Sequence, residues 1–167
     1  MRTLILLACS LAGAAFLAAG ARAVEPVNGT LSVEHGKGLV MLEMRGSILG
    51  RLGNGVVTVT DLTPRDRYTA TVVGRKMKEI HVGLRTTRYR GQGLRFRMLG
   101  GNWRVVLRGA GVDVSAVGRG AVTLQADRVT PFDDAGVYSL DGVDCSLDPT
   151  SCTPLPDDLE RFALGTQ

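Results

Sequence analysis

Residues 44–59 read MRGSILGRLGNGVVTV, and residues 107–124 repeat this pattern as LRGAGVDVSAVGRGAVTL with a two-residue insertion. Arg45-Gly46 aligns with Arg108-Gly109, and Gly53-Asn-Gly55 aligns with Gly118-Arg-Gly120. Each copy, with the strand before it, is typical of a three-stranded meander. Two such meanders, with residues 69–98 between them, predict an all-β, antiparallel two-sheet β-sandwich. A β-helix (solenoid) is the alternative, but its repeats recur every 20 to 30 residues or so, whereas this one recurs once, after roughly 64.

Short runs of alternating apolar residues predict the strands, and glycines separate them. Glycine supplies the positive φ that tight turns need, so each Gly-x-Gly predicts a connection between antiparallel strands. A phosphate-binding loop would lead into a helix, and these sequences lead into β runs. Residues 159–164 fit one helical turn or an edge strand. The predicted strands are 39–44, 56–60, 94–98, 103–107 and 121–125, and the predicted turns are 36–38, 53–55, 100–102 and 118–120.

The first 23 residues have the form of a secretory signal peptide. A basic start at Arg2 precedes an apolar run over residues 4–19, and Ala21-Arg-Ala23 is a small-x-small cleavage site. We therefore expect export and a mature chain, residues 24–167, that folds as one domain without a transmembrane segment. The alternatives are an uncleaved anchor and lipidation at Cys9, which ends a Leu-Leu-Ala-Cys sequence.

Two cysteines remain after cleavage, Cys145 and Cys152. An even number of cysteines in an exported chain predicts a disulfide. This disulfide would close a short loop in an acidic C-terminal stretch, residues 127–160, which has nine acidic residues and one basic residue.

The middle of the chain is basic, with twelve Lys or Arg residues and two acidic residues between Arg65 and Arg108. Period-two alternation separates arginines from the apolar residues Leu94, Phe96 and Met98. An arginine-lined sheet face of this kind suits an anionic envelope polymer, a phospholipid surface or a nucleic acid, because the guanidinium fork fits phosphate and carboxylate. Pairing with the acidic C-terminal stretch is the alternative. The predicted anion-binding residues are Arg88, Arg90, Arg95 and Arg97.

The chain resembles a group of uncharacterised secreted proteins of high-GC bacteria over about residues 30–140. The resemblance is carried by residues 45–55, by Tyr89-Arg-Gly91 with Leu94-Arg-Phe-Arg97, and by residues 117–124. A ratio of 17 Arg to 3 Lys suits such a genome. The resemblance implies export and an all-β fold, and it implies no catalytic residue.

The residue pattern predicts no catalytic constellation, no metal site and no cofactor. His35 and His81 could form a hydrolase or metal site with Glu34 and Glu79 only if distant strands brought them together. Few aromatic residues are present, so the sequence has no specific nucleic-acid signal. The leading hypothesis is a non-enzymatic, secreted or cell-envelope structural or interaction module, whose partner would be an anionic envelope polymer or another envelope protein. An anionic-polymer binder is the second hypothesis, and a hydrolase assembled from distant residues is the third.

Overall fold

The computed structural model describes residues 27–130, 133–140 and 142–165, and the predicted signal peptide with Cys9 and Val24 lies outside them. The described chain forms a seven-stranded antiparallel sheet, which confirms the all-β prediction. None of its helices is long and apolar enough to cross a membrane. The strands are β1 (Gly29–Asp61), β2 (Ala70–Gly83), β3 (Thr86–Met98), β4 (Asn102–Ala126), β5 (Val137–Ser139), β6 (Thr153–Pro154) and β7 (Glu160–Leu164), with a 3₁₀ turn at Pro149–Ser151.

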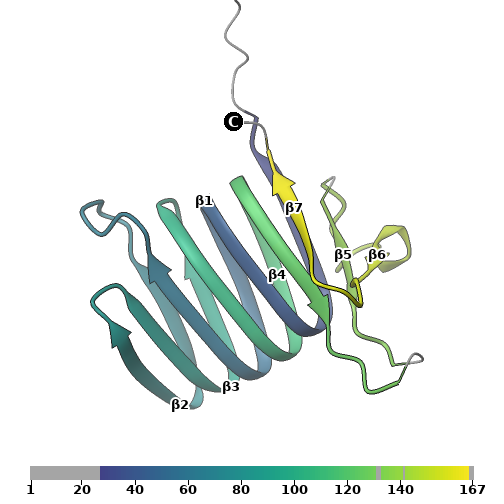
Figure 1. Cartoon of the computed structure of the whole chain (residues 1–167), viewed down its shortest axis with the longest axis horizontal. Helices are drawn as coiled ribbons and strands as arrows, with labels where there is room; N and C mark the ends of the chain where they lie inside the picture. Colours follow the sequence, from purple (N-terminus) through teal and green to yellow (C-terminus); the bar gives the residue numbers. More distant parts are fainter. Residues whose placement is uncertain (1–26, 131–132, 141, 166–167) are drawn as a thin grey trace, which may run out of the picture.

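The long strands bend back on themselves, so one continuous sheet makes two layers (Figure 1). The strand order is β2-β3-β1-β4-β7, and β5 pairs with β1 and β6. Residues 38–45 of β1 pair with residues 102–109 of β4 on one side and with 119–126 of β4 on the other. Residues 112–118 of β4 pair in the same way with two segments of β1. Strands β1 and β4 are therefore wound around each other.

We call the two halves of the sandwich the front layer and the back layer, as seen in Figure 1. Each of β1 to β4 contributes to both layers. The front layer consists of residues 78–83, 86–91, 54–61, 102–109, 38–45 and 119–126 and of β7, and the back layer consists of residues 70–75, 92–98, 46–52, 112–118 and 29–36 and of β5.

The core lies between the layers and is one apolar cluster. Strand alternation puts every second side chain inside, for example Leu42 and Leu107 from the front layer and Leu52 and Leu94 from the back layer. Gly50 leaves space for the ring of its cross-strand partner Phe96, since a Cβ at position 50 would lie 2.5 Å from that ring. All five predicted strand segments lie within β1, β3 and β4.

The Gly-x-Gly sequences at 36–38, 53–55 and 118–120 are not hairpin turns, and that prediction is wrong. They lie inside β1 and β4, at the corners where a strand passes from one layer to the other. Gly100 and Gly101 do form a turn, but it joins β3 to β4, which lie on opposite sides of β1. Positive φ serves a corner as well as a turn, which is why the pattern was ambiguous.

The two copies of the repeat pair with each other and do not form two separate meanders. Gly46 lies opposite Gly118 and Gly55 lies opposite Gly109. In the first pair the φ angles are 152° and 158°, and a Cβ on either residue would lie 2.2 Å from a carbonyl oxygen of the other strand. These corners therefore require glycine on both strands.

The C-terminal stretch packs against the β1 and β4 side of the sheet, at the end opposite β2 (Figure 1). The predicted disulfide between Cys145 and Cys152 is present, with the Cα atoms 5.9 Å apart. Cys145 is fully buried, and its N–H donates to Ser32 Oγ of β1 at 3.1 Å. Of the two alternatives for residues 159–164, the edge strand is the one observed, as β7.

Candidate functional site

A groove crosses the outer face of the front layer, where β2, β3, β1 and β4 lie side by side. Val56 of β1 lies between Arg90 of β3 and Arg108 of β4, and Thr58 lies between Arg88 and Val106. The neighbouring residues Val57, Tyr89 and Leu107 point inward, so alternation turns this whole set outward. The groove has a volume of about 490 Å³ and is lined by Val56, Thr58, Ile80, Arg88, Arg90, Val106 and Arg108.

The register of the strands sets the spacing of the three arginines. Arg90 and Arg108 are separated by one strand, which places their backbones roughly 10 Å apart. Arg88 and Arg90 are two residues apart on one strand, or roughly 7 Å. The arginines therefore surround an apolar floor made by Val56 and Val106.

The three groove arginines have no acidic partner within 4.0 Å among the described residues. Arg104, farther along the same face, is different, because it donates to Glu43 Oε1 at 2.8 Å. Glu43 also lies 4.0 Å from Arg161 of β7. The groove arginines therefore have no ion-pair partner within the described chain, and the groove can attract an anion.

The predicted arginine strip is divided between the two outer faces. Arg88 and Arg90 lie in the front layer, whereas Arg95 and Arg97 lie in the back layer. Strand β3 changes layer at residues 91–93, where Gly93 has a φ of 55°. The expectation that all four arginines share one face is wrong for this reason.

Arg108 was missed as a groove residue, although it stands in the repeat beside a corner glycine. Its position next to Val56 follows only from the pairing of β1 with β4. Sequence alternation shows which residues point outward, but it does not show which distant strands are neighbours.

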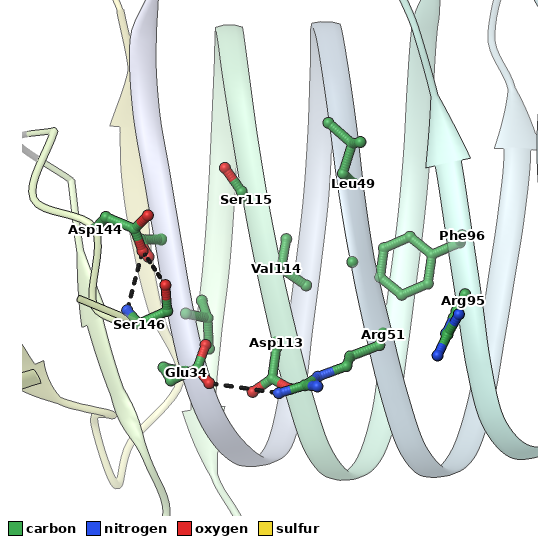
Figure 2. Close-up of a pocket in the computed structure, with 13 residues that line it drawn as sticks. Glu34, Leu49, Arg51, Arg95, Phe96, Asp113, Val114, Ser115, Asp144 and Ser146 are labelled. Carbon is green, nitrogen blue, oxygen red and sulfur yellow. Dashed lines mark hydrogen bonds and ion pairs between the residues drawn. The ribbon is translucent and has the colours of Figure 1, made fainter.

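The outer face of the back layer has a second hollow, of about 530 Å³, with mixed charges (Figure 2). Arg51 forms an ion pair and a hydrogen bond with Asp113, and it lies 3.7 Å from Glu34 Oε1. Arg95 lies opposite Arg51 on the neighbouring strand. Glu34 and Asp113 therefore share the guanidinium of Arg51, whereas Asp144, the third carboxylate of the hollow, accepts hydrogen bonds from Ser146.

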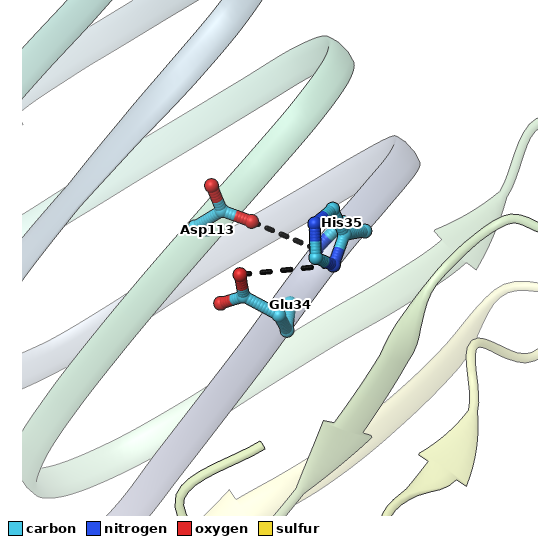
Figure 3. A group of neighbouring side chains, drawn as sticks. All are labelled: Glu34, His35 and Asp113. Carbon is cyan, nitrogen blue, oxygen red and sulfur yellow. Dashed lines mark hydrogen bonds and ion pairs between the residues drawn. The ribbon is translucent and has the colours of Figure 1, made fainter. Parts of the chain in front are cut away.

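Glu34, His35 and Asp113 are the described residues that could together hold a metal ion, because one potential ligand atom from each lies within 4.8 Å of the other two (Figure 3). Burial, and then the nearby carboxylate of Asp113, raise the pKa of Glu34 above its usual value. The backbone N–H of His35 donates to Asp113 Oδ1 at 2.7 Å. Arg51 already lies against both carboxylates, so a cation would have to compete with its guanidinium. Asp113 was missed from the sequence, although its place between Val112 and Val114 shows that it points outward.

The two histidines do not come together. His81 lies on β2, 3.6 Å from Glu79, and its Nδ1 is 3.2 Å from the hydroxyl of Thr87. His35 lies on the first segment of β1, which pairs with β4 and β5 and not with β2. The geometry does not assemble the four-residue site of the hydrolase hypothesis.

The acidic stretch forms its own contacts, and its described residues make no ion pair with the predicted arginines. Among the described residues, its ion pairs are Lys37–Asp133 at 3.6 Å and Arg128–Asp157 at 3.0 Å. A hydrogen bond from the Thr130 hydroxyl, together with backbone N–H groups, lowers the pKa of Asp133. None of the described ion pairs joins this stretch to the arginines at 88, 90, 95 or 97.

The comparisons with known proteins add no assignment to this geometry. No family model, no curated protein and no solved structure matches the chain. Its function has to be argued from the groove and from the surfaces around it.

Proposed function

We propose that this protein is a secreted, non-enzymatic binding module that holds an anionic ligand in the front-layer groove. The supporting observation is that Arg88, Arg90 and Arg108 surround one apolar floor without an acidic partner among the described residues. Guanidinium groups bind phosphate and carboxylate oxygens through pairs of parallel N–H donors. A ligand with several anionic groups would contact more than one of the three.

The residues that line the groove favour binding over catalysis. Its lining contains no carboxylate, histidine or cysteine, so the one hydroxyl of the lining, that of Thr58, has no general base of the usual kinds beside it. In this proposal the groove recognises the ligand by its charge and shape, and the ligand is released without chemical change.

The test compares two double variants on the same strand. Arg88→Gln with Arg90→Gln removes two groove charges, whereas Arg95→Gln with Arg97→Gln removes the same charge from the opposite face. Binding of a poly(glycerol phosphate) polymer should weaken steeply with salt in the wild type, because each contact releases counterions. The groove variant should flatten the salt dependence by about one unit per lost contact, and the control should bind like the wild type.

Isothermal titration at low and high salt measures both quantities. An equal loss of affinity in the two variants would mean that net charge, and not the groove, attracts the polymer. Binding that is insensitive to salt and to both pairs of substitutions would exclude the groove as the site.

A further inference from the structure

The hairpin between β2 and β3 ends in an apolar tip. Gly83 pairs with Thr86, so Leu84 and Arg85 form a two-residue turn at the end of the sheet farthest from β7 (Figure 1). Leu84 is fully exposed, and the β2 residues before it, Ile80 and Val82, are 41% and 52% exposed. Two-residue turns favour Asn, Asp and Gly, so a leucine at this position does not serve the turn.

The apolar tip adjoins the cationic groove. Ile80 lines the groove and lies opposite Arg88 on β3. Arg85 stands next to Leu84 in the turn itself, and Lys78 lies opposite Arg90. The same end of the front layer thus presents a protruding apolar group and, directly behind it, several positive charges.

The tip is held in place by β1. The Asp61 N–H donates to the Arg85 carbonyl oxygen at 2.9 Å, and the hydroxyls of Thr60 and Thr86 are 3.0 Å apart. Leu84 is therefore presented on a fixed turn, and its exposure does not result from fraying of the hairpin.

We propose that this tip inserts Leu84 into an anionic lipid bilayer while Arg85, Arg88 and Arg90 contact the lipid phosphates. This inference rests on the proposed function and names its ligand as the headgroups of an anionic membrane. An anionic bilayer has negative charge at its surface and hydrocarbon directly below. The hairpin matches this order, because the apolar Leu84 at its tip would reach the hydrocarbon while the positive side chains behind it meet the charged surface. An acidic protein would match the charges, but it offers no apolar layer that a protruding side chain must enter.

The experiment uses vesicles of neutral phosphatidylcholine and vesicles containing about 30% phosphatidylglycerol, which supply the anionic surface. The wild type should sediment with the anionic vesicles only. Leu84→Ser should bind them roughly tenfold more weakly or worse, because the inserted apolar group is lost. Leu147→Ser is the matched control, since Leu147 is also highly exposed but lies in the C-terminal stretch. Both variants should bind poly(glycerol phosphate) as the wild type does.

A second measurement reports insertion directly. The single tryptophan, Trp103, is buried at 3% exposure, so its emission should not respond to vesicles. In the variant Leu84→Trp, addition of anionic vesicles should shift the emission to the blue, whereas the polymer should not.

The outcomes separate the two proposals. Full vesicle binding by Leu84→Ser, or no shift in Leu84→Trp, overturns insertion and leaves the groove proposal standing. Polymer binding without vesicle binding in the wild type also overturns insertion and points to a soluble polyanion or an acidic protein. If the wild type binds neither the polymer nor the anionic vesicles, both proposals are overturned.

Discussion

At the residue scale, the paired glycines decide how the strands turn. Gly46 and Gly118 lie so close together that a side chain on either one would collide with a carbonyl oxygen of the other strand. Gly55 and Gly109 repeat this arrangement, with 2.1 Å between each ideal Cβ and a carbonyl oxygen. The corners therefore depend on the absence of four Cβ atoms.

Replacing one of these glycines should destabilise the fold. We expect Gly46→Ala to lower the free energy of unfolding by at least about 1 to 3 kcal/mol, from backbone strain alone. Gly83→Ala is the control, because a Cβ there meets nothing within 4 Å. Urea denaturation of both variants measures the difference, and equal midpoints would show that the corners tolerate a side chain.

The raised pKa of Glu34 should make stability depend on pH. The folded state holds the Glu34 proton more tightly than the unfolded chain does, where the pKa is near the usual value of 4.5. The stabilisation is thus complete below that value and is lost as the pH rises through the higher folded-state pKa.

We expect the Tm of the wild type, relative to that of Glu34→Gln, to fall as the pH rises from about 4 through the raised folded-state pKa of Glu34. The glutamine stays neutral throughout and resembles the protonated acid. Thermal melts of both proteins across this range provide the measurement. A constant difference would mean that Arg51 compensates the Glu34 charge fully.

At the scale of the elements, the sequence is sufficient to predict where the strands lie, but it is not sufficient to predict which strands pair with each other. Alternation in residues 94–98 and 103–107 predicts strands with the correct inward side chains, since burial on one face imposes a period of two. Glycine with positive φ fits a turn or a corner, so the layer change at residues 91–93 could not be predicted. Because of this ambiguity, the sequence predicted that Arg95 and Arg97 share a face with Arg88 and Arg90. Arg108 could not be predicted as a groove residue, because its position depends on the pairing of β1 with β4.

The disulfide belongs to the same scale, because it secures one segment. Reducing the Cys145–Cys152 bond should cost at most about 2.5 kcal/mol, given the short loop that it closes. The expected fall in Tm is several degrees, and the protein should stay folded. Thermal melts with and without reductant test this. Leu155 of the C-terminal stretch already belongs to the core cluster. Global unfolding on reduction would show that the whole fold depends on how the disulfide holds this stretch against Ser32.

At the scale of the whole molecule, the proposed export would determine which part of the chain folds. We expect the exported protein to begin at Val24 and to carry no lipid, which leaves β1 intact from Gly29 onward. Mass spectrometry of the protein recovered from outside the producing cells measures its N-terminus. An acylated species that begins at Cys9 would contradict this expectation.

The interwound strands have a consequence for how the chain acquires its structure. Leu39 pairs with Arg108 and with Gln125, so the middle of β1 lacks one of its two partner segments until the chain is complete past residue 125. Contacts this distant in sequence form slowly, because a long loop must close before any pairing stabilises it. If the chain is exported as we propose, the pairing of β1 with β4 should therefore be completed only after residue 126 has been translocated. Once formed, β1 cannot peel away from one edge, since its central segment is held on both sides, and spontaneous unfolding should be correspondingly rare.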